Sequence, residues 1–171
     1  MMWKNVTIAV VAASILAIVG LPSWAEGHDD PAALAKALPQ ASLPLEKACK
    51  VSDREGKPVS AKYEIENGAL QLSIYTMKGS RFSELIIDHT SGAVANEEWI
   101  TDADDMKAAQ AQAAAMAKAK VTLDVAIANA VNGNTGYRAV SATPTLEADR
   151  PVAVVILMKG EDVKKVTEKL D

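Results

Sequence analysis

The chain has 171 residues, of which 18 are basic and 22 acidic, for a net charge of −4. The two signs are interspersed, which argues against nucleic acid or an anionic membrane as the partner, because an acidic surface gains nothing from counterion release. The single cysteine, Cys49, excludes an intramolecular disulfide, and we predict that it is a small buried core residue.

Residues 1–25 are predicted to be a secretory signal peptide. Lys4 precedes an apolar run that ends at Leu21, and Ser23 and Ala25 are small residues at the −3 and −1 positions of a cleavage site. The run is shorter than the roughly 20 residues that span a bilayer. We therefore expect cleavage after Ala25, a periplasmic or secreted protein, and no membrane insertion after cleavage.

The next two segments are an arm and a helix. Residues 26–41 are expected to be a flexible arm with at most a turn of helix, because glycine and prolines flank a short Ala/Leu run. Ser42 is predicted to cap a helix that has Pro44 in its first turn. Leu45 and Ala48 begin the apolar stripe of that helix.

Strands follow, as far as residue 100. Residues 59–65 alternate between apolar and polar side chains, as half-buried strands do, and residues 70–76 repeat the pattern. Asn67-Gly68 lies between them and is the strongest short hairpin signal. Residues 81–88 form a third strand, and residues 93–100 continue in extended form after a turn.

The remaining chain contains a connecting helix and a second segment. Residues 101–119 are Ala-rich with acids at the start and lysines at the end, which predicts a helix. The second segment, 120–171, opens with a helix and continues with two strands around a turn at residues 148–150. Residues 160–171 fit either a third strand or a terminal helix, and comparison with the first segment favours the strand.

The two segments resemble each other. Residues 45–48 (Leu-Glu-Lys-Ala) are echoed by residues 123–126 (Leu-Asp-Val-Ala), and residues 72–79 are echoed by residues 153–160, which share the ending Met-Lys-Gly. This predicts an α+β protein with two tandem units, 42–100 and 120–171. Each unit would be a helix packed on a small antiparallel sheet, and the helix at 101–119 would join them. The residues predicted to be buried are Leu45, Ala48, Tyr63, Ile65, Leu72, Ile74, Leu85 and Ile87 in the first unit and Leu123, Ile127, Val140, Val154 and Ile156 in the second.

The order of elements, with the Lys-Pro-Val-x-Ala-x-Tyr-x-Ile strand at residues 57–65 and a strand that ends Ile-Asp-His-Thr-Ser-Gly-Ala-Val at 87–94, resembles the PepSY domain family. Asp88 and Gly92 match the Asp and Gly that close the family's last long strand. The second segment lacks this turn and would be a degenerate unit. The resemblance implies a small secreted protein that binds or inhibits a protein, such as a protease, and it implies no catalytic residues. For Asp88 and Gly92 a structural role in the turn is expected.

Enzyme activity is not expected. The sequence has two histidines, His28 and His89, and it lacks the nucleophile elbow, the P-loop, the dinucleotide fingerprint and the zinc-protease motif. No resident cofactor is expected. One metal hypothesis remains, because cleavage after Ala25 would leave Glu26-Gly27-His28 as a new N-terminus. The amine, two amides and the imidazole would form a square-planar four-nitrogen site that suits Cu(II) or Ni(II).

Three functions are compatible with these features. The favoured one is a non-enzymatic, exported binding or inhibitory module that engages a peptide or envelope protein through its sheets, by an exposed edge strand or a sheet face. The second is a periplasmic Cu(II)- or Ni(II)-binding protein that uses Glu26, Gly27 and His28. The third is a structural accessory subunit of an envelope complex.

Overall fold

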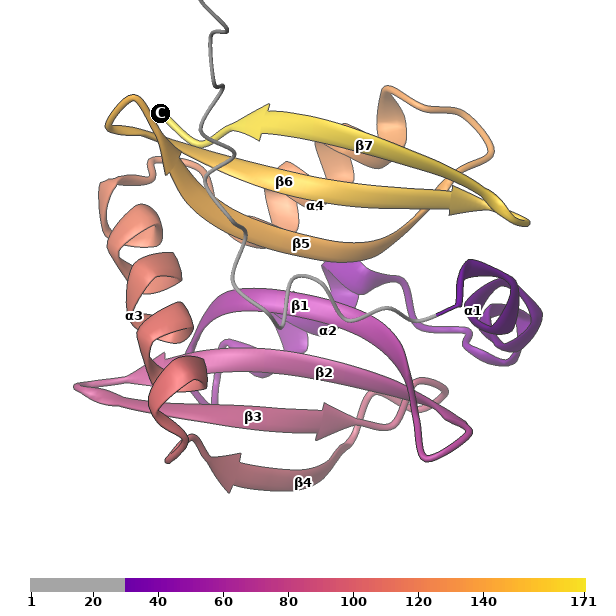
Figure 1. The fold of residues 1–171 in the computed structure, drawn as a ribbon, viewed down its shortest axis with the longest axis horizontal. Helices are drawn as coiled ribbons and strands as arrows, with labels where there is room; N and C mark the ends of the chain where they lie inside the picture. The colour runs from indigo at the N-terminus through magenta and orange to yellow at the C-terminus, as the bar shows by residue number, and fades with distance from the viewer. Residues whose placement is uncertain (1–29) are drawn as a thin grey trace, which may run out of the picture.

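The computed structural model describes residues 30–171, in which helices precede runs of antiparallel strands (Figure 1). The first half contains helix α1 (Pro31–Ala37), the 3-10 helix η2 (Leu38–Gln40), helix α2 (Leu45–Ser52) and the strands β1 (Lys57–Glu66), β2 (Ala69–Lys78), β3 (Arg81–Ile87) and β4 (Val94–Trp99). The second half contains α3 (Ala103–Lys118), α4 (Leu123–Asn132), β5 (Arg138–Glu147), β6 (Arg150–Lys159) and β7 (Asp162–Lys169). The predicted α+β class is confirmed, and so is the strand predicted within residues 160–171.

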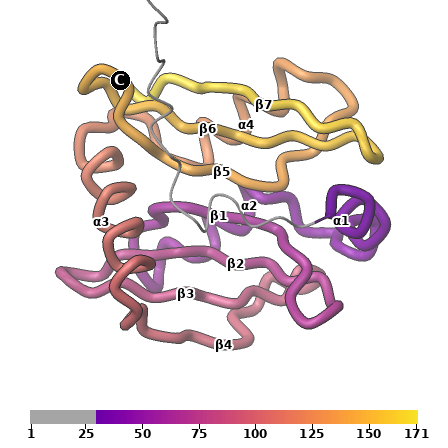
Figure 2. Tube along the Cα trace, in the orientation of Figure 1, coloured from indigo at the N-terminus to yellow at the C-terminus, as the bar shows by residue number. Residues whose placement is uncertain are grey.

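All seven strands belong to one antiparallel sheet, in the order β4-β3-β2-β1-β5-β6-β7. Both segments follow the order helix and then antiparallel strands, as expected, but their strands do not form two separate small sheets. β1 pairs with β5 and joins them, so that the two halves lie side by side in the chain trace (Figure 2). One hydrophobic core runs behind both halves.

The helices cover the two faces of this sheet unequally. Helices α2 and α4 pack side by side on one face and bury the main core, whereas α3 lies on the opposite, open face (Figure 1). There, Ala109 and Ala113 of α3 pack against Val59 and Phe82 in a second, smaller apolar cluster. Because α3 covers only one end of the open face, the other end carries the candidate site described below.

Most of the predicted core is confirmed. The predicted side chains on α2, α4 and β1–β3 are buried, except for Ile65, which is half-buried against the core. The prediction for β6 was wrong. Ala153, Val155 and Leu157 are fully buried against α4, and Val154 and Ile156 are half-buried on the open face. Because β6 lies inside the sheet and is apolar from Val152 to Met158, its sequence contains no alternation that would mark the face.

The predicted flexible arm is also corrected, for the part that the structure describes. Residues 31–40 are helical, because the carboxylate of Asp30 accepts a hydrogen bond from the amide of Ala32 and Pro31 fits the first helical position. Leu34 and Leu38 are buried in the main core. Residues 26–29 and the predicted signal peptide lie outside the described residues.

Helix α2 begins two residues later than predicted. Pro44 is its N-cap residue, and the hydroxyl of Ser42 donates instead to the carbonyl oxygen of Thr90 at 3.1 Å. The amides of Ser42 and Leu43 both donate to the carbonyl oxygen of His89. The segment before α2 is therefore tied to the turn that follows β3.

Arg138, at the start of β5, holds the N-terminal helices on the sheet. Its guanidinium donates to the carbonyl oxygens of Leu38 and Ala41 at 3.0 and 2.8 Å, and to that of Leu43 at 3.0 Å. It also lies 5.0 Å from the ring centroid of Tyr63. A planar donor fork satisfies several carbonyl groups that η2 and the following loop leave without strand partners.

The hairpins turn through left-handed backbone. Asn67 and Gly68 have φ values of 51° and 80° between β1 and β2, as the sequence predicted. The equivalent turn between β5 and β6 uses Ala148 and Asp149, with φ values of 48° and 67°. Both turns therefore use left-handed backbone, and Ala148 is the one turn residue of the four that does not favour it.

We expect the substitution Ile74→Ala to lower the free energy of unfolding by about 2–5 kcal/mol, because the side chain is fully buried and its loss leaves a cavity. Urea denaturation followed by circular dichroism measures the change. Val125→Ala, at a position that is 45% exposed, is the control and should change the free energy by less than about 0.5 kcal/mol. Equal effects of the two substitutions would show that the core is misplaced.

We also expect Arg138→Lys to loosen the N-terminal helices, since a single ammonium cannot replace the guanidinium fork. Amide hydrogen exchange in residues 31–43 should accelerate, while exchange in β2 and β6 stays slow. The free energy of unfolding should fall by about 1.5–3 kcal/mol, the value of hydrogen bonds to a charged group. Unchanged exchange in residues 31–43 would contradict the anchoring role.

Candidate functional site

The seam between β1 and β5 is the shortest pairing in the sheet. Only two residue pairs define it, Ala61 with Ala142 and Lys62 with Ser141, whereas β1 pairs with β2 along its whole length. Beyond these pairs the strands diverge (Figure 1). The divergence leaves room for a cleft on the open face, between α3 at one end and α1 at the other.

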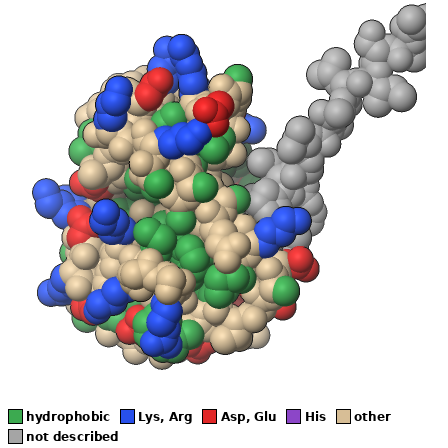
Figure 3. Space-filling model, turned by 90° about the vertical axis from the view of Figure 1, so that its left-hand side faces the viewer, with side chains coloured by type: hydrophobic (Ala, Val, Ile, Leu, Met, Phe, Trp, Pro, Cys, Tyr) green, Lys and Arg blue, Asp and Glu red, His purple; other side chains and the backbone are tan. Residues whose placement is uncertain are grey.

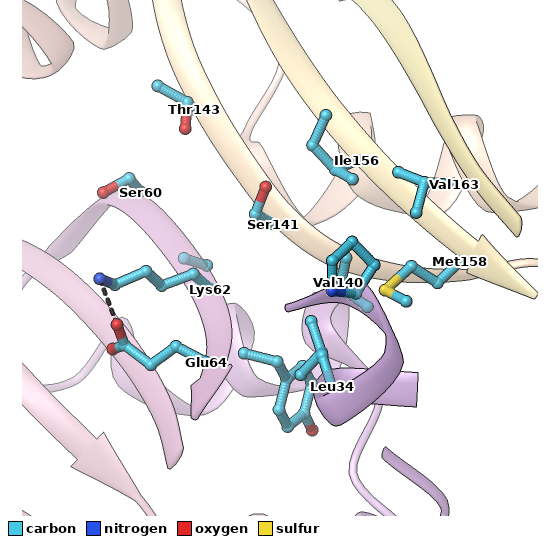
Figure 4. Close-up of a pocket in the computed structure, with 13 residues that line it drawn as sticks. Leu34, Ser60, Lys62, Glu64, Val140, Ser141, Thr143, Ile156, Met158 and Val163 are labelled. Carbon is cyan, nitrogen blue, oxygen red and sulfur yellow. Dashed lines mark ion pairs between the residues drawn. The ribbon is translucent and has the colours of Figure 1, made fainter. Parts of the chain in front are cut away.

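The cleft has a volume of about 200 Å³ and takes its lining from α1 and four of the strands. The lining residues are Pro31 and Leu34 of α1, Ser60, Ala61, Lys62, Tyr63 and Glu64 of β1, Val140, Ser141 and Thr143 of β5, Ile156 and Met158 of β6, and Val163 of β7. Figure 4 shows that apolar side chains gather at the α1 end, whereas Ser60, Lys62 and Thr143 lie toward the other end. The cleft is therefore amphipathic.

The polar end of the cleft contains an ion pair in a partly buried position. The Lys62 Nζ atom lies 2.5 Å from Glu64 Oε2, and the two side chains are only 19% and 15% exposed. Glu64 Oε1 accepts hydrogen bonds from Ser73 Oγ at 2.8 Å and from Gln71 Nε2 at 3.5 Å. Both oxygens of the carboxylate are thus occupied, and the network fixes the position of the lysine.

A tyrosine borders this network on the next strand. The hydroxyl of Tyr75 donates to Glu84 Oε1 at 3.0 Å, and Lys62 Nζ lies 5.7 Å from the tyrosine ring centroid. Burial raises the pKa of the Tyr75 hydroxyl, and the nearby carboxylates of Glu84 and Glu64 raise it further. The tyrosine is therefore a neutral hydrogen-bond donor at every physiological pH, and it supplies no base.

A second cleft, of about 290 Å³, lies where the chain passes from α3 to α4. Asp53, Asp124, Lys57 and Lys120 border it. Burial raises the pKa of Asp53, and the Asp124 carboxylate adds to the rise. Seen from the α3 side, hydrophobic side chains gather in the middle of the molecule with lysines and arginines around them (Figure 3). Within residues 30–171, some buried polar atoms lack a hydrogen-bond partner, and none of them borders this second cleft. One of them, Ser60 Oγ, belongs to a residue that lines the open-face cleft, which is therefore the better candidate.

The metal site predicted at Glu26, Gly27 and His28 lies outside the described residues. Within residues 30–171, no group of three or more His, Cys, Asp or Glu side chains has the arrangement to hold a metal ion. In the same part of the chain, no helix is both long enough and apolar enough to cross a bilayer.

Asp88 and Gly92 have the structural role that the sequence predicts. The Asp88 carboxylate accepts hydrogen bonds from the amides of Thr90 and Ser91 at 2.9 and 2.7 Å, and Gly92 has a φ of 79°. These amide hydrogen bonds lower the pKa of Asp88 below its usual value. His89, between them, is half-buried, and its carbonyl oxygen supports the segment before α2.

Cys49 is buried in the main core, as predicted, with 1% of its surface exposed. Burial raises the pKa of its thiol, and the carboxylates of Asp124, Asp53 and Glu46 add to the rise. The thiol is therefore protonated and inaccessible, which is the opposite of what a reactive cysteine needs.

The sequence did not reveal the cleft. Ser60, Lys62 and Glu64 fitted the solvent-facing half of an alternating strand, and the pairing of β1 with β5 lies between residues about 80 positions apart. The one available signal was in β6, which has apolar side chains on both faces. A strand with a single buried face needs only one set, so Ile156 and Met158 indicated that the second face is also partly buried.

The Asp88 turn should give stability that depends on pH. Because its folded-state pKa is lowered, its contribution is complete above its ordinary pKa of 3.8 and is lost as the pH falls below that value. We expect Asp88→Ala to destabilise the protein at pH 7 and to differ less from the wild type near pH 3, in urea titrations at both values. Glu147→Ala, at an exposed site, is the control. A difference that stays constant with pH would contradict the role of the carboxylate.

Comparison with known proteins assigns no function to the chain, so any proposal rests on the geometry of the cleft. No protein-family model, no curated protein and no solved structure matches the chain.

Proposed function

We propose that the chain is an exported, non-enzymatic binding module that engages a peptide segment through the open face of its sheet, at the cleft over the β1–β5 seam. Its partner would be an extended or terminal segment of an envelope protein or a protease, which the module would bind or inhibit. The amphipathic cleft is the observation that carries this proposal, because ligand sites combine an apolar floor with a few placed polar groups.

The rigidity of the site supports the proposal. The floor consists of side chains on adjacent strands of one sheet, and the polar end is fixed by the Lys62–Glu64 pair and its hydrogen bonds to Ser73 and Gln71. A preformed site on regular elements binds with little loss of conformational entropy. The titratable groups beside it, by contrast, include no histidine and no thiol.

Two further features are consistent with the proposal. The resemblance to PepSY domains suggests secretion and protein binding, and the matching order of α2-β1-β2-β3 and α4-β5-β6-β7 agrees with a duplication of one unit. Under this proposal, fusing the two sheets edge to edge created the cleft at the seam. A single unit would expose β1 as an edge strand and would lack half of the lining.

A peptide library displayed on phage and selected against the chain from residue 26 onward tests the proposal. Val163→Asp should weaken the selected peptides by about tenfold or more, because a charge in the apolar end must be desolvated on binding. Val125→Asp is a matched control, since the two valines are 46% and 45% exposed and Val125 lies on α4. It should change affinity by less than about twofold.

A second arm of the experiment separates the cleft from the sheet edges. Peptides with N-methylated backbones cannot add a strand to β4 or β7, but they still present side chains to a cleft. Retained binding that is sensitive to Val163→Asp supports the cleft. If neither Val163→Asp nor Val125→Asp changes the affinity of the selected peptides, the cleft is not the binding site.

A further inference from the structure

The two outer edges of the sheet carry charges of opposite sign. β4 and β7 are the edge strands, and within residues 30–171 each of them pairs on one side only (Figure 1). β4 contains the exposed Glu97 and Glu98 and no basic residue. β7 has the exposed Lys164 and Lys165 in its middle, and its two acids lie near its ends. One edge is therefore acidic and the other is basic at its centre.

These four charges have no charged partner in the same chain, as far as residues 30–171 show. None of them belongs to an ion pair there. Glu98 accepts a hydrogen bond from the side-chain amide of Asn96, and the Lys164 ammonium donates to the side-chain oxygen of Asn134, so both of these partners are neutral. Each edge therefore keeps its charges available to another molecule.

β4 and β7 run in the same direction. Every pair of neighbouring strands is antiparallel, so the first and the seventh strand of the sheet point the same way, as their arrows show (Figure 1). A second copy that continues the sheet beyond β7, with its helices on the same face, therefore presents its β4 parallel to β7. Parallel strands form a regular hydrogen-bonded ladder, although one slightly less stable than the antiparallel ladder.

The charges also lie on matching faces of the two strands. Glu97 lies opposite Leu85 of β3, which is buried in the main core. Lys164 lies opposite Leu157 of β6, which is buried in the same core. Directly opposed residues in an antiparallel pair share a face of the sheet. Glu97 and Lys164 therefore both belong to the helix-covered face, and the residue that follows each of them belongs to the open face.

One parallel register brings all of these residues together. With Glu97 beside Lys164, Glu98 lies beside Lys165 on the open face. The next position places Trp99 beside Val166 on the helix-covered face. Trp99 is 42% exposed in the single chain, and Val166 is half-buried. The register thus combines two ion pairs with one apolar contact.

We propose that copies of this chain associate edge to edge, with β4 of one copy added in parallel to β7 of the next. Pairs of like edges are disfavoured, because a twofold axis would place charges of one sign on both sides of the joint. Charged edges commonly prevent such pairing, but edges of opposite sign attract each other. Each added copy leaves one acidic and one basic edge free, so the association continues beyond a dimer. It does not depend on a peptide in the cleft.

Sedimentation velocity of the chain from residue 26 onward tests the pairing. The weight-average sedimentation coefficient should rise with concentration between about 10 μM and 1 mM, and it should rise less in about 1 M NaCl, because salt screens exposed charges. Trp99 is the single tryptophan of residues 26–171, so tryptophan emission should shift to shorter wavelength as the copies associate. A sedimentation coefficient that does not rise with concentration at low salt would overturn the proposal.

Charge reversal at each edge assigns the contact. The double variant Glu97→Lys with Glu98→Lys makes both edges basic, and Lys164→Glu with Lys165→Glu makes both acidic. Each double variant alone should therefore stay monomeric across the same concentration range. An equimolar mixture of the two should associate again, because edges of opposite sign are then present on different molecules.

A matched control separates the edges from net charge. Lys36→Glu with Lys107→Glu changes the net charge as much as the β7 double variant does, at exposed positions on α1 and α3, and self-association should persist. Circular dichroism should show the same fold in every variant, since all the substitutions are at exposed sites. A mixture of folded edge variants that stays monomeric would overturn the proposal. Self-association that survives in either edge variant alone would also overturn it, because another surface would then join the copies.

Discussion

The rest of the structure depends on the two residue pairs that join β1 to β5. They convert two runs of antiparallel strands into one sheet, and without them each run would expose an unpaired edge. Because the pairing is so short, the strands diverge beyond it, and the side chains at the divergence face the cleft. α3 packs against both β1 and β5 and spans the seam on the open face, while α2 and α4 pack together behind it. The helices therefore stabilise a junction that the strands alone hold weakly.

Arg138, at the start of β5, links the β1–β5 junction to the N-terminal helices. Its donors satisfy carbonyl groups of η2 and the following loop, which places Leu34 at one end of the cleft. A charged side chain that is half-buried among carbonyl oxygens is stable only while those oxygens stay in place. The wall of the cleft and the start of β5 are thus coupled through one guanidinium.

Local structure was readable from the sequence where local signals agreed. Tyr63, Leu72 and Ile74 alternate with polar residues around Asn67-Gly68, and the structure buries all three. β6 does not follow the same rule, because its second face is also partly buried and its apolar residues are continuous. Leu34 was missed for a different reason: a short helix of two turns is stabilised by tertiary contacts, and its partner Arg138 is distant in sequence.

The candidate site could not be predicted in this way. Ser60 and Ser141 look like ordinary solvent-facing residues in their own strands, and only the seam brings them onto one cleft. Polar residues that line a site only because two distant strands pair do not produce a periodic pattern in the sequence. By contrast, Asp88 and Gly92 act within a single turn, so their role followed directly from their types and spacing.

The two hairpin turns have a consequence for the order of folding. In the first half, Asn67-Gly68 favours the left-handed turn by itself, so the β1–β2 hairpin can close on local preference alone. In the second half, Ala148 adopts the same conformation against its own preference, at a cost of about 1–2 kcal/mol. Pairing of β5 with β6 must supply that energy, and apolar residues along β6 do so only when α3 and α4 are there to bury them. We therefore expect the first hairpin to close earlier than the second, whose turn forms only once the helices cover β6.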